Sequence, residues 1–133
     1  MIYTSVGADR MILISDSMCA TGMEDGKYTL GGLDVFVKDG KATLIDGTIA
    51  GSTSTLYDMF KYAVSFGIPL EDAVKMSTLT PSRAVGIDKN VGTIEEGKDA
   101  DIVILDKKLN IVKVFYKGKL ISDKTLYCCF YSK

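Results

Sequence analysis

The stretch that decides the fold is Met11-Ile12-Leu13-Ile14-Ser15-Asp16, an apolar run that ends in a carboxylate. Its apolar residues are consecutive rather than alternate, which predicts a strand at residues 11–15 that is buried on both faces. Strands of that kind belong to parallel sheets whose faces are covered by helices. The expected fold class is therefore α/β. Because one parallel strand needs neighbours, we expect partner strands upstream of it.

Short strands and tight turns are expected after this first strand. Asp39-Gly40 separates strand-forming segments at residues 33–38 and 41–45, and an Asp-Gly pair is a strong hairpin signal. The sequence therefore predicts a β-hairpin excursion at about residues 28–46. Beyond residue 97 the pattern predicts strands at residues 100–105 and 111–116, and a short one at 120–121.

Two helices are expected between these strand regions. Helical spacing predicts a helix that opens at Gly51-Ser52-Thr53, with Ser52 or Thr53 as its cap, and that stops at Gly67. A second helix should follow Pro69, since proline and the acidic residues after it favour a helix start. Its expected inward face consists of Ala73, Val74, Met76 and Ser77. Thr80-Pro81 is expected to break this helix and start a shorter one.

Composition excludes several classes of function. The net charge is −1 with both signs mixed along the chain, so no basic surface argues for a nucleic-acid partner. The longest apolar runs are about five residues, against roughly 20 needed to cross a bilayer, and residues 1–10 do not resemble a signal peptide. Cys19, Cys128 and Cys129 show neither metal-ligand spacing nor a disulfide framework. We expect no nucleic acid, no membrane and a cytoplasmic location.

Asp16 is the strongest candidate for chemistry. An acid placed directly after a buried strand lies at the rim of a parallel sheet or barrel, where such folds build their active sites. A carboxylate there can act as a general base and then as an acid. The alternative is an aspartate that caps a helix or stabilises a loop.

Two glycine-rich segments were weighed as ligand sites. Residues 47–53 (Gly-Thr-Ile-Ala-Gly-Ser-Thr) form a small-residue loop whose backbone a ligand could approach, although by itself a tight turn with a capping serine is the better account of the pattern. Gly92 and Gly97-Lys98 have the spacing of a phosphate-binding loop. That interpretation is rejected because Asp99 stands where Ser or Thr is required, two acids lie inside the loop, and a strand follows in place of a helix.

Taken together, these segments resemble the C-terminal third of the N-acetylglucosamine-6-phosphate deacetylases, a family of the amidohydrolase superfamily. The likeness runs from about residue 7 to residue 121. Five stretches carry it in the family's order, namely residues 12–18 (Ile-Leu-Ile-Ser-Asp-Ser-Met), 22–32, 46–52, 76–84 and 92–106. The last stretch is the least specific, because many amidohydrolases end in that way.

The resemblance implies a C-terminal fragment of a distorted (β/α)8 TIM-like barrel beside a small β-sandwich. Residues 1–90 would end the barrel, 91–121 would supply sandwich strands, and 122–133 would form a tail. By position, Asp16 would be the catalytic base and acid, while Ile49, Ala50 and Gly51 would meet the sugar through their backbone. The family hydrolyses N-acetylglucosamine 6-phosphate to glucosamine 6-phosphate and acetate in amino-sugar catabolism. It uses a divalent metal of the zinc or iron type, held by one Glu and two His.

The chain contains no histidine, so no metal ligand was assigned and no metal is expected to bind this chain. We therefore expect the chain to be inactive alone. Because the strand at residues 11–15 would lack a neighbour, we expect it to be covered by self-association, by strand exchange, or by docking of residues 1–6 or the tail, with a homo-oligomer as the expected state. Two alternatives stay open, a fragment of another amidohydrolase such as a dihydroorotase-like enzyme, and a non-catalytic self-associating module. The roles of the tail and of its paired cysteines are left unassigned.

Overall fold

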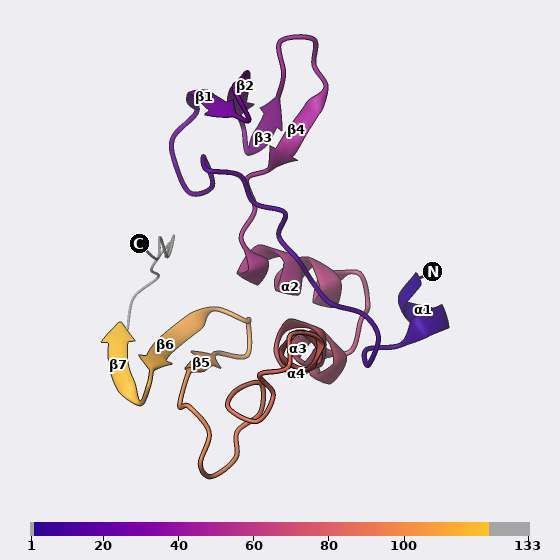
Figure 1. Ribbon diagram of the computed structural model, residues 1–133, viewed down its shortest axis with the longest axis vertical. Helices are drawn as coiled ribbons and strands as arrows, with labels where there is room; N and C mark the ends of the chain where they lie inside the picture. Colours follow the sequence, from indigo (N-terminus) through magenta and orange to yellow (C-terminus); the bar gives the residue numbers. More distant parts are fainter. Residues whose placement is uncertain (1, 123–133) are drawn as a thin grey trace. The chain divides into compact units, whose positions relative to one another are not determined.

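The computed structural model describes residues 2–122 and contains both helices and antiparallel sheets (Figure 1). The chain divides into two compact units. The described residues of the first are 2–13 and 60–122, and those of the second are 14–59. Each unit is built around its own set of contacts and is described separately below.

The second unit is a four-stranded antiparallel sheet in which neighbouring strands follow the chain order. Its strands are β1 (Gly26–Leu30), β2 (Leu33–Lys38), β3 (Lys41–Thr43) and β4 (Ile49–Ser52). β2 and β3 meet at Asp39-Gly40, where both residues have positive φ values of 49° and 72°. That is the geometry of a type I′ hairpin turn, so the predicted hairpin is confirmed.

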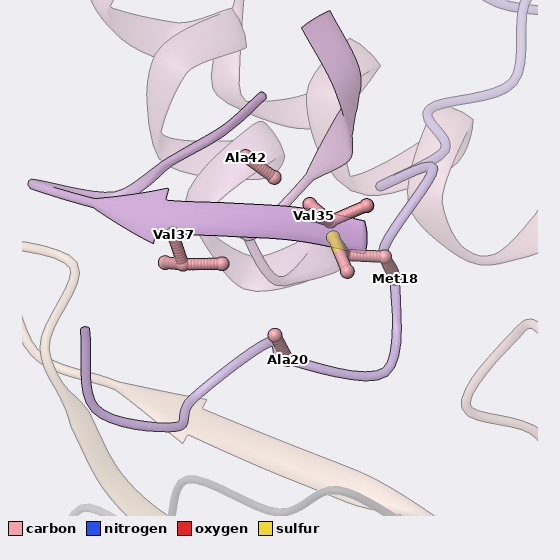
Figure 2. Close-up of a cluster of buried hydrophobic side chains, with 5 residues drawn as sticks. All are labelled: Met18, Ala20, Val35, Val37 and Ala42. Carbon is pink, nitrogen blue, oxygen red and sulfur yellow. The ribbon is translucent and has the colours of Figure 1, made fainter. Parts of the chain in front are cut away.

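One face of this sheet carries the core of the second unit. Figure 2 shows the five buried side chains, Met18, Ala20, Val35, Val37 and Ala42. Val35 and Val37 point to this face because side chains alternate along a strand, while Phe36 between them is exposed. Met18 and Ala20 come from the loop after Asp16, so this loop is anchored by burial against β2.

The first unit combines four helical segments with a three-stranded antiparallel sheet. The helices are α1 (Ile2–Val6), α2 (Leu56–Ser65), which enters this unit at Phe60, α3 (Leu70–Ser77) and α4 (Leu79–Ala84). The sheet has the order β5 (Ile102–Leu105), β6 (Ile111–Tyr116) and β7 (Lys119–Ser122). Ala73 and Met76 on α3 are fully buried, as predicted.

The N-terminal segment is fastened to α3 and α4 by polar contacts. The Tyr3 hydroxyl donates a hydrogen bond to the Asp72 carboxylate. The buried Thr80 hydroxyl donates to the carbonyl of Ala8 at 2.8 Å. Asp9 pairs with Lys75 at 2.6 Å, and this contact lowers the pKa of the Asp9 carboxyl below its usual value.

Several local predictions are wrong. Residues 11–15 do not form a strand, and their exposure alternates, with Ile14 exposed to 69%. The physical reason is pairing: in the described part of the chain no strand lies beside them, and the one backbone bond of this run joins Leu13 N–H to the Met76 carbonyl. Val74 on α3 is 42% exposed rather than inward. The break between the two helices falls at Thr78, and Pro81 is accommodated in the first turn of α4.

Candidate functional site

The candidate site lies in the second unit, where the loop after residue 15 meets the end of β4. Ser17 and Ser52 form an isolated parallel β-bridge. The Ser52 N–H donates to the Asp16 carbonyl at 3.2 Å, and the Met18 N–H donates to the Ser52 carbonyl at 2.9 Å. These two bonds bring the loop that carries Asp16 against the strand that carries the predicted sugar-contacting residues.

The Asp16 side chain is solvent-exposed, but Asp16 does not follow a strand as expected, because residues 11–15 do not form one. Its backbone has φ of 50°, in the left-handed region that few residues other than glycine, asparagine and aspartate adopt. This conformation turns the chain sharply between the extended run before Asp16 and the buried Met18. Asp16 is therefore held in a defined turn, and its carboxylate is neither buried nor the cap of a helix.

Ile49, Ala50 and Gly51 belong to β4 and not to a loop that opens a helix. β4 forms because β3 supplies a hydrogen-bonded neighbour, with Ala42 opposite Gly51 and a register shift between Ala42 and Thr43. Ile49 is exposed, whereas Ala50 and Gly51 are partly buried. The structure thus leaves the Ile49 side chain exposed, and the contact of these three residues with a sugar stays a prediction.

The helix after β4 begins later than the sequence predicted. Ser52 and Thr53 do not cap it. Instead Thr55 and Asp58 form a reciprocal pair, in which the Thr55 N–H donates to the Asp58 carboxylate at 3.0 Å and the Asp58 N–H donates to the Thr55 hydroxyl at 3.2 Å. This is a capping box, and the Thr-x-x-Asp spacing at 55–58 was the signal that could have located it.

The segment from Gly92 to Lys98 is a turn that leads to β5, as expected. The Lys98 side chain is only 13% exposed. Its ammonium group donates to the Asp88 carbonyl at 2.8 Å and to the Thr93 hydroxyl, and it lies 3.5 Å from the Glu95 carboxylate. The lysine is thus occupied by its own loop and is not presented to a phosphate.

The residues that the structure describes do not fit a transition-metal site. The chain has no histidine, and among residues 2–122 no group of three or more Cys, Asp and Glu side chains is arranged to hold an ion. Cys19 has a free thiol that contacts the Thr29 carbonyl at 3.3 Å. Cys128 and Cys129 lie outside the described residues. In the same described part, no helix has the length and apolar character that crossing a bilayer requires.

Comparison with known proteins places these features in a family. The amidohydrolase family model matches residues 10–121. The N-acetylglucosamine-6-phosphate deacetylase of Vibrio furnissii is 41% identical over 115 residues, which cover 86% of this chain and 29% of that protein. The N-acetylgalactosamine-6-phosphate deacetylase of Escherichia coli O157:H7 is 36% identical over 115 residues, 86% of this chain and 30% of that protein.

A solved structure of a protein with the same name matches the fold of this chain over most of its length. The crystal structure of the N-acetylglucosamine-6-phosphate deacetylase from Thermotoga maritima superposes with a TM-score of 0.85 at 37% identity, over 92% of this chain and 34% of that one. This chain therefore spans about a third or less of the length of these relatives. The family match and the shared mixed α/β fold lead to one conclusion: the chain belongs to the amidohydrolase family.

Proposed function

We propose that the chain is the C-terminal part of an N-acetylglucosamine-6-phosphate deacetylase, acting on N-acetylglucosamine 6-phosphate in amino-sugar catabolism. The carrying observation is the Ser17–Ser52 bridge, which joins the loop of Asp16 to β4. An acidic residue alone, or a strand alone, would be weak support for this function. A carboxylate held beside an accessible backbone edge gives both a proton acceptor and a surface for the sugar.

We further propose that residues 1–90 end a (β/α)8 barrel and that residues 91–121 contribute strands to a small β-sandwich. The likeness to the Thermotoga maritima structure supports this assignment, since it covers 92% of the chain. The two compact units are defined by contacts within this chain, so the barrel and sandwich boundaries stay a proposal.

In the proposed reaction Asp16 moves one proton. Water attacks the acetamide carbonyl carbon and forms a C–O bond. At the same time an Oδ atom of Asp16 takes the proton that the water gives up. The same oxygen then delivers the proton to the nitrogen as the C–N bond breaks, which releases the amine of glucosamine 6-phosphate and acetate. The carboxylate can make both contacts because Asp16 is exposed.

The residues of β4 would hold the sugar during this transfer. Ala50 has only a methyl group, so a ligand can approach its peptide group closely, whereas the space beside the Gly51 Cα is lined by Met18 and Leu30. The divalent metal that the family implies has no ligand set among residues 2–122, and the chain has no histidine.

The relatives include enzymes named for two epimeric substrates. The glucosamine enzyme of Vibrio furnissii is 41% identical and the galactosamine enzyme of Escherichia coli is 36% identical over the same length. N-acetylgalactosamine 6-phosphate is therefore the second candidate substrate, and it differs from the first at one hydroxyl of the sugar.

A chimera tests this proposal. The matching C-terminal 29% of the Vibrio furnissii deacetylase is replaced by this chain, and acetate release is measured with each of the two sugar phosphates. We expect activity, with a higher kcat/KM for the glucosamine substrate. Asp16→Asn should lower kcat by about 10²–10⁴-fold, the usual contribution of a general acid–base group.

Asp39→Asn is the matched control. Asp39 is also exposed and also has a left-handed backbone, with φ of 49°, but it lies in the β2–β3 turn. Both substitutions remove one carboxylate and keep a residue that tolerates positive φ. If the two variants lose activity equally, Asp16 has no special role. An inactive parent chimera would refute the proposed function itself.

A further inference from the structure

The position of Asp16 depends on how its loop is attached to β4. Two backbone hydrogen bonds make that attachment, Ser52 N–H to the Asp16 carbonyl and Met18 N–H to the Ser52 carbonyl. A bridge of two bonds is weak by itself, because a single intramolecular hydrogen bond adds little to net stability. A further contact is therefore needed to hold the left-handed backbone conformation of Asp16.

The Ser17 side chain supplies a third connection beyond the bridge. Its hydroxyl donates to the carbonyl of Ser54 at 2.6 Å. Ser54 is in turn fixed on β4, because its N–H donates to the Ser52 hydroxyl at 3.0 Å. The Thr21 hydroxyl also donates to the Ser52 carbonyl at 3.3 Å. The loop is therefore joined to the strand at Ser52 by backbone and by Thr21, and at Ser54 by the Ser17 side chain.

Burial holds the far side of the same loop. Met18, next to Ser17, lies in the core of this unit with only 6% exposure, and a Cβ placed on Gly51 would lie 3.5 Å from the Met18 Cβ. Core packing thus fixes Met18, and the hydroxyl of Ser17 fixes the residue between Met18 and Asp16. The Asp16 side chain itself faces solvent, so the position of Asp16 depends on the contacts of its neighbours Ser17 and Met18.

We propose that Ser17 is a positioning residue for the deacetylation, whose hydroxyl sets the direction of the Asp16 carboxylate relative to the backbone of Ile49–Ser52. This inference rests on the proposed function of Asp16. Catalytic geometry is sensitive to small displacements, and a shift of about 1 Å can cost a hundredfold in rate. Loss of one exposed hydrogen bond changes overall stability much less. Ser17 should therefore affect kcat more than folding.

The first test uses the full chain and needs no activity. Amide hydrogen exchange is measured by NMR on the wild type, Ser17→Ala and Ser17→Thr. In Ser17→Ala we expect the Ser52 and Met18 amides to exchange about tenfold faster, while amides of β1–β2 pairs keep their rates. Ser17→Thr retains the hydroxyl and should restore slow exchange. Unchanged Ser52 and Met18 rates in Ser17→Ala would overturn the proposal, whatever the enzyme assay gives.

The second test uses the chimera with N-acetylglucosamine 6-phosphate. Ser17→Ala should lower kcat about tenfold with KM unchanged, and Ser17→Thr should recover most of the loss. Ser65→Ala is the matched control, since the Ser65 hydroxyl also donates to a carbonyl, that of Tyr62 at 2.8 Å, on an exposed helix surface. It should leave kcat unchanged.

The outcomes separate the two proposals. A raised KM with unchanged kcat would mean that Ser17 contacts the substrate, and it would overturn the positioning role. A wild-type kcat in Ser17→Ala would overturn it as well. A parent chimera without activity would refute the function proposed for Asp16, and the exchange measurement would then still decide whether the Ser17 hydroxyl holds the bridge.

Discussion

Replacing Gly92 by alanine should destabilise the chain for two separable reasons. Gly92 has φ of 95°, a conformation that residues with a Cβ rarely adopt. A Cβ built there would also lie 2.3 Å from the Ser82 Oγ, 3.1 Å from the Ser82 Cβ and 3.2 Å from the Leu79 Cα. The loop before β5 therefore approaches α4 too closely for any side chain at position 92.

The expected loss can be estimated from these two effects. A left-handed backbone costs a residue with a Cβ about 1–2 kcal/mol. Extra atoms in a packed region typically cost about 1–3 kcal/mol more. Because domains are stable by only about 5–15 kcal/mol, Gly92→Ala should lower the midpoint of unfolding by roughly 10–20 °C.

Gly97→Ala is the control that isolates the steric effect. Gly97 is in the same loop and has φ of 88°, but no atom lies within 4 Å of a Cβ built on it. It should therefore lose only the conformational part. Chemical denaturation followed by circular dichroism gives the free energy of unfolding of each variant.

A double mutant tests the identity of the clash. Ser82→Ala removes the Oγ atom that would overlap with the new methyl group, at the expense of one hydrogen bond to the Leu79 carbonyl. Gly92→Ala combined with Ser82→Ala should be more stable than the sum of the single changes predicts. Equal losses in Gly92→Ala and Gly97→Ala, or strict additivity in the double mutant, would refute the steric argument.

Three further outcomes are expected. The hydrogen bond to Lys75 lowers the pKa of Asp9. This contact therefore stabilises the fold above the unfolded pKa of about 3.9, and its stabilisation is lost as the pH falls through the lower pKa of the folded state. The difference in stability between wild type and Asp9→Asn, measured by denaturation, should shrink below about pH 4. Purified chain should hold no stoichiometric zinc or iron by mass spectrometry and release no acetate from N-acetylglucosamine 6-phosphate above buffer controls, because it has no imidazole ligands. Bound metal or released acetate would contradict the metal argument. Sedimentation should show self-association at micromolar concentration, and a folded monomer whose residue 11–15 amides exchange rapidly with solvent would contradict that expectation.

The elements that the sequence predicted well are those defined by local signals. The expected strands at 33–38 and 111–116 match β2 and β6 in both bounds. Alternation of side chains marks the two faces of β2, and Asp39-Gly40 has the backbone that its turn requires. Gly67 ends α2 in the left-handed conformation expected of a helix stop.

The errors occur where a distant segment decides the local structure. Ile49–Ser52 is a strand because β3 lies beside it, and its small residues alone suggested a loop. The pairing of Asp16 with Ser52 depends on a parallel bridge between segments far apart in the sequence, which no local pattern predicts. The resemblance to known deacetylases selected both segments, and the structure adds the bond through Ser17 that joins them.

The apolar run at residues 11–14 shows the limit of pattern-based inference most clearly. Consecutive apolar residues predict that both faces of a strand are covered, but the cover must come from other segments. In the structure Leu13 is tied to the Met76 carbonyl, while Ile12 and Ile14 remain exposed to 38% and 69%. Burying a side chain of that size contributes about 1.5–3 kcal/mol, so the run retains a driving force that the described chain does not use. The same driving force is the reason to expect both self-association of the chain and a gain in stability when the chimera supplies the upstream part of a deacetylase.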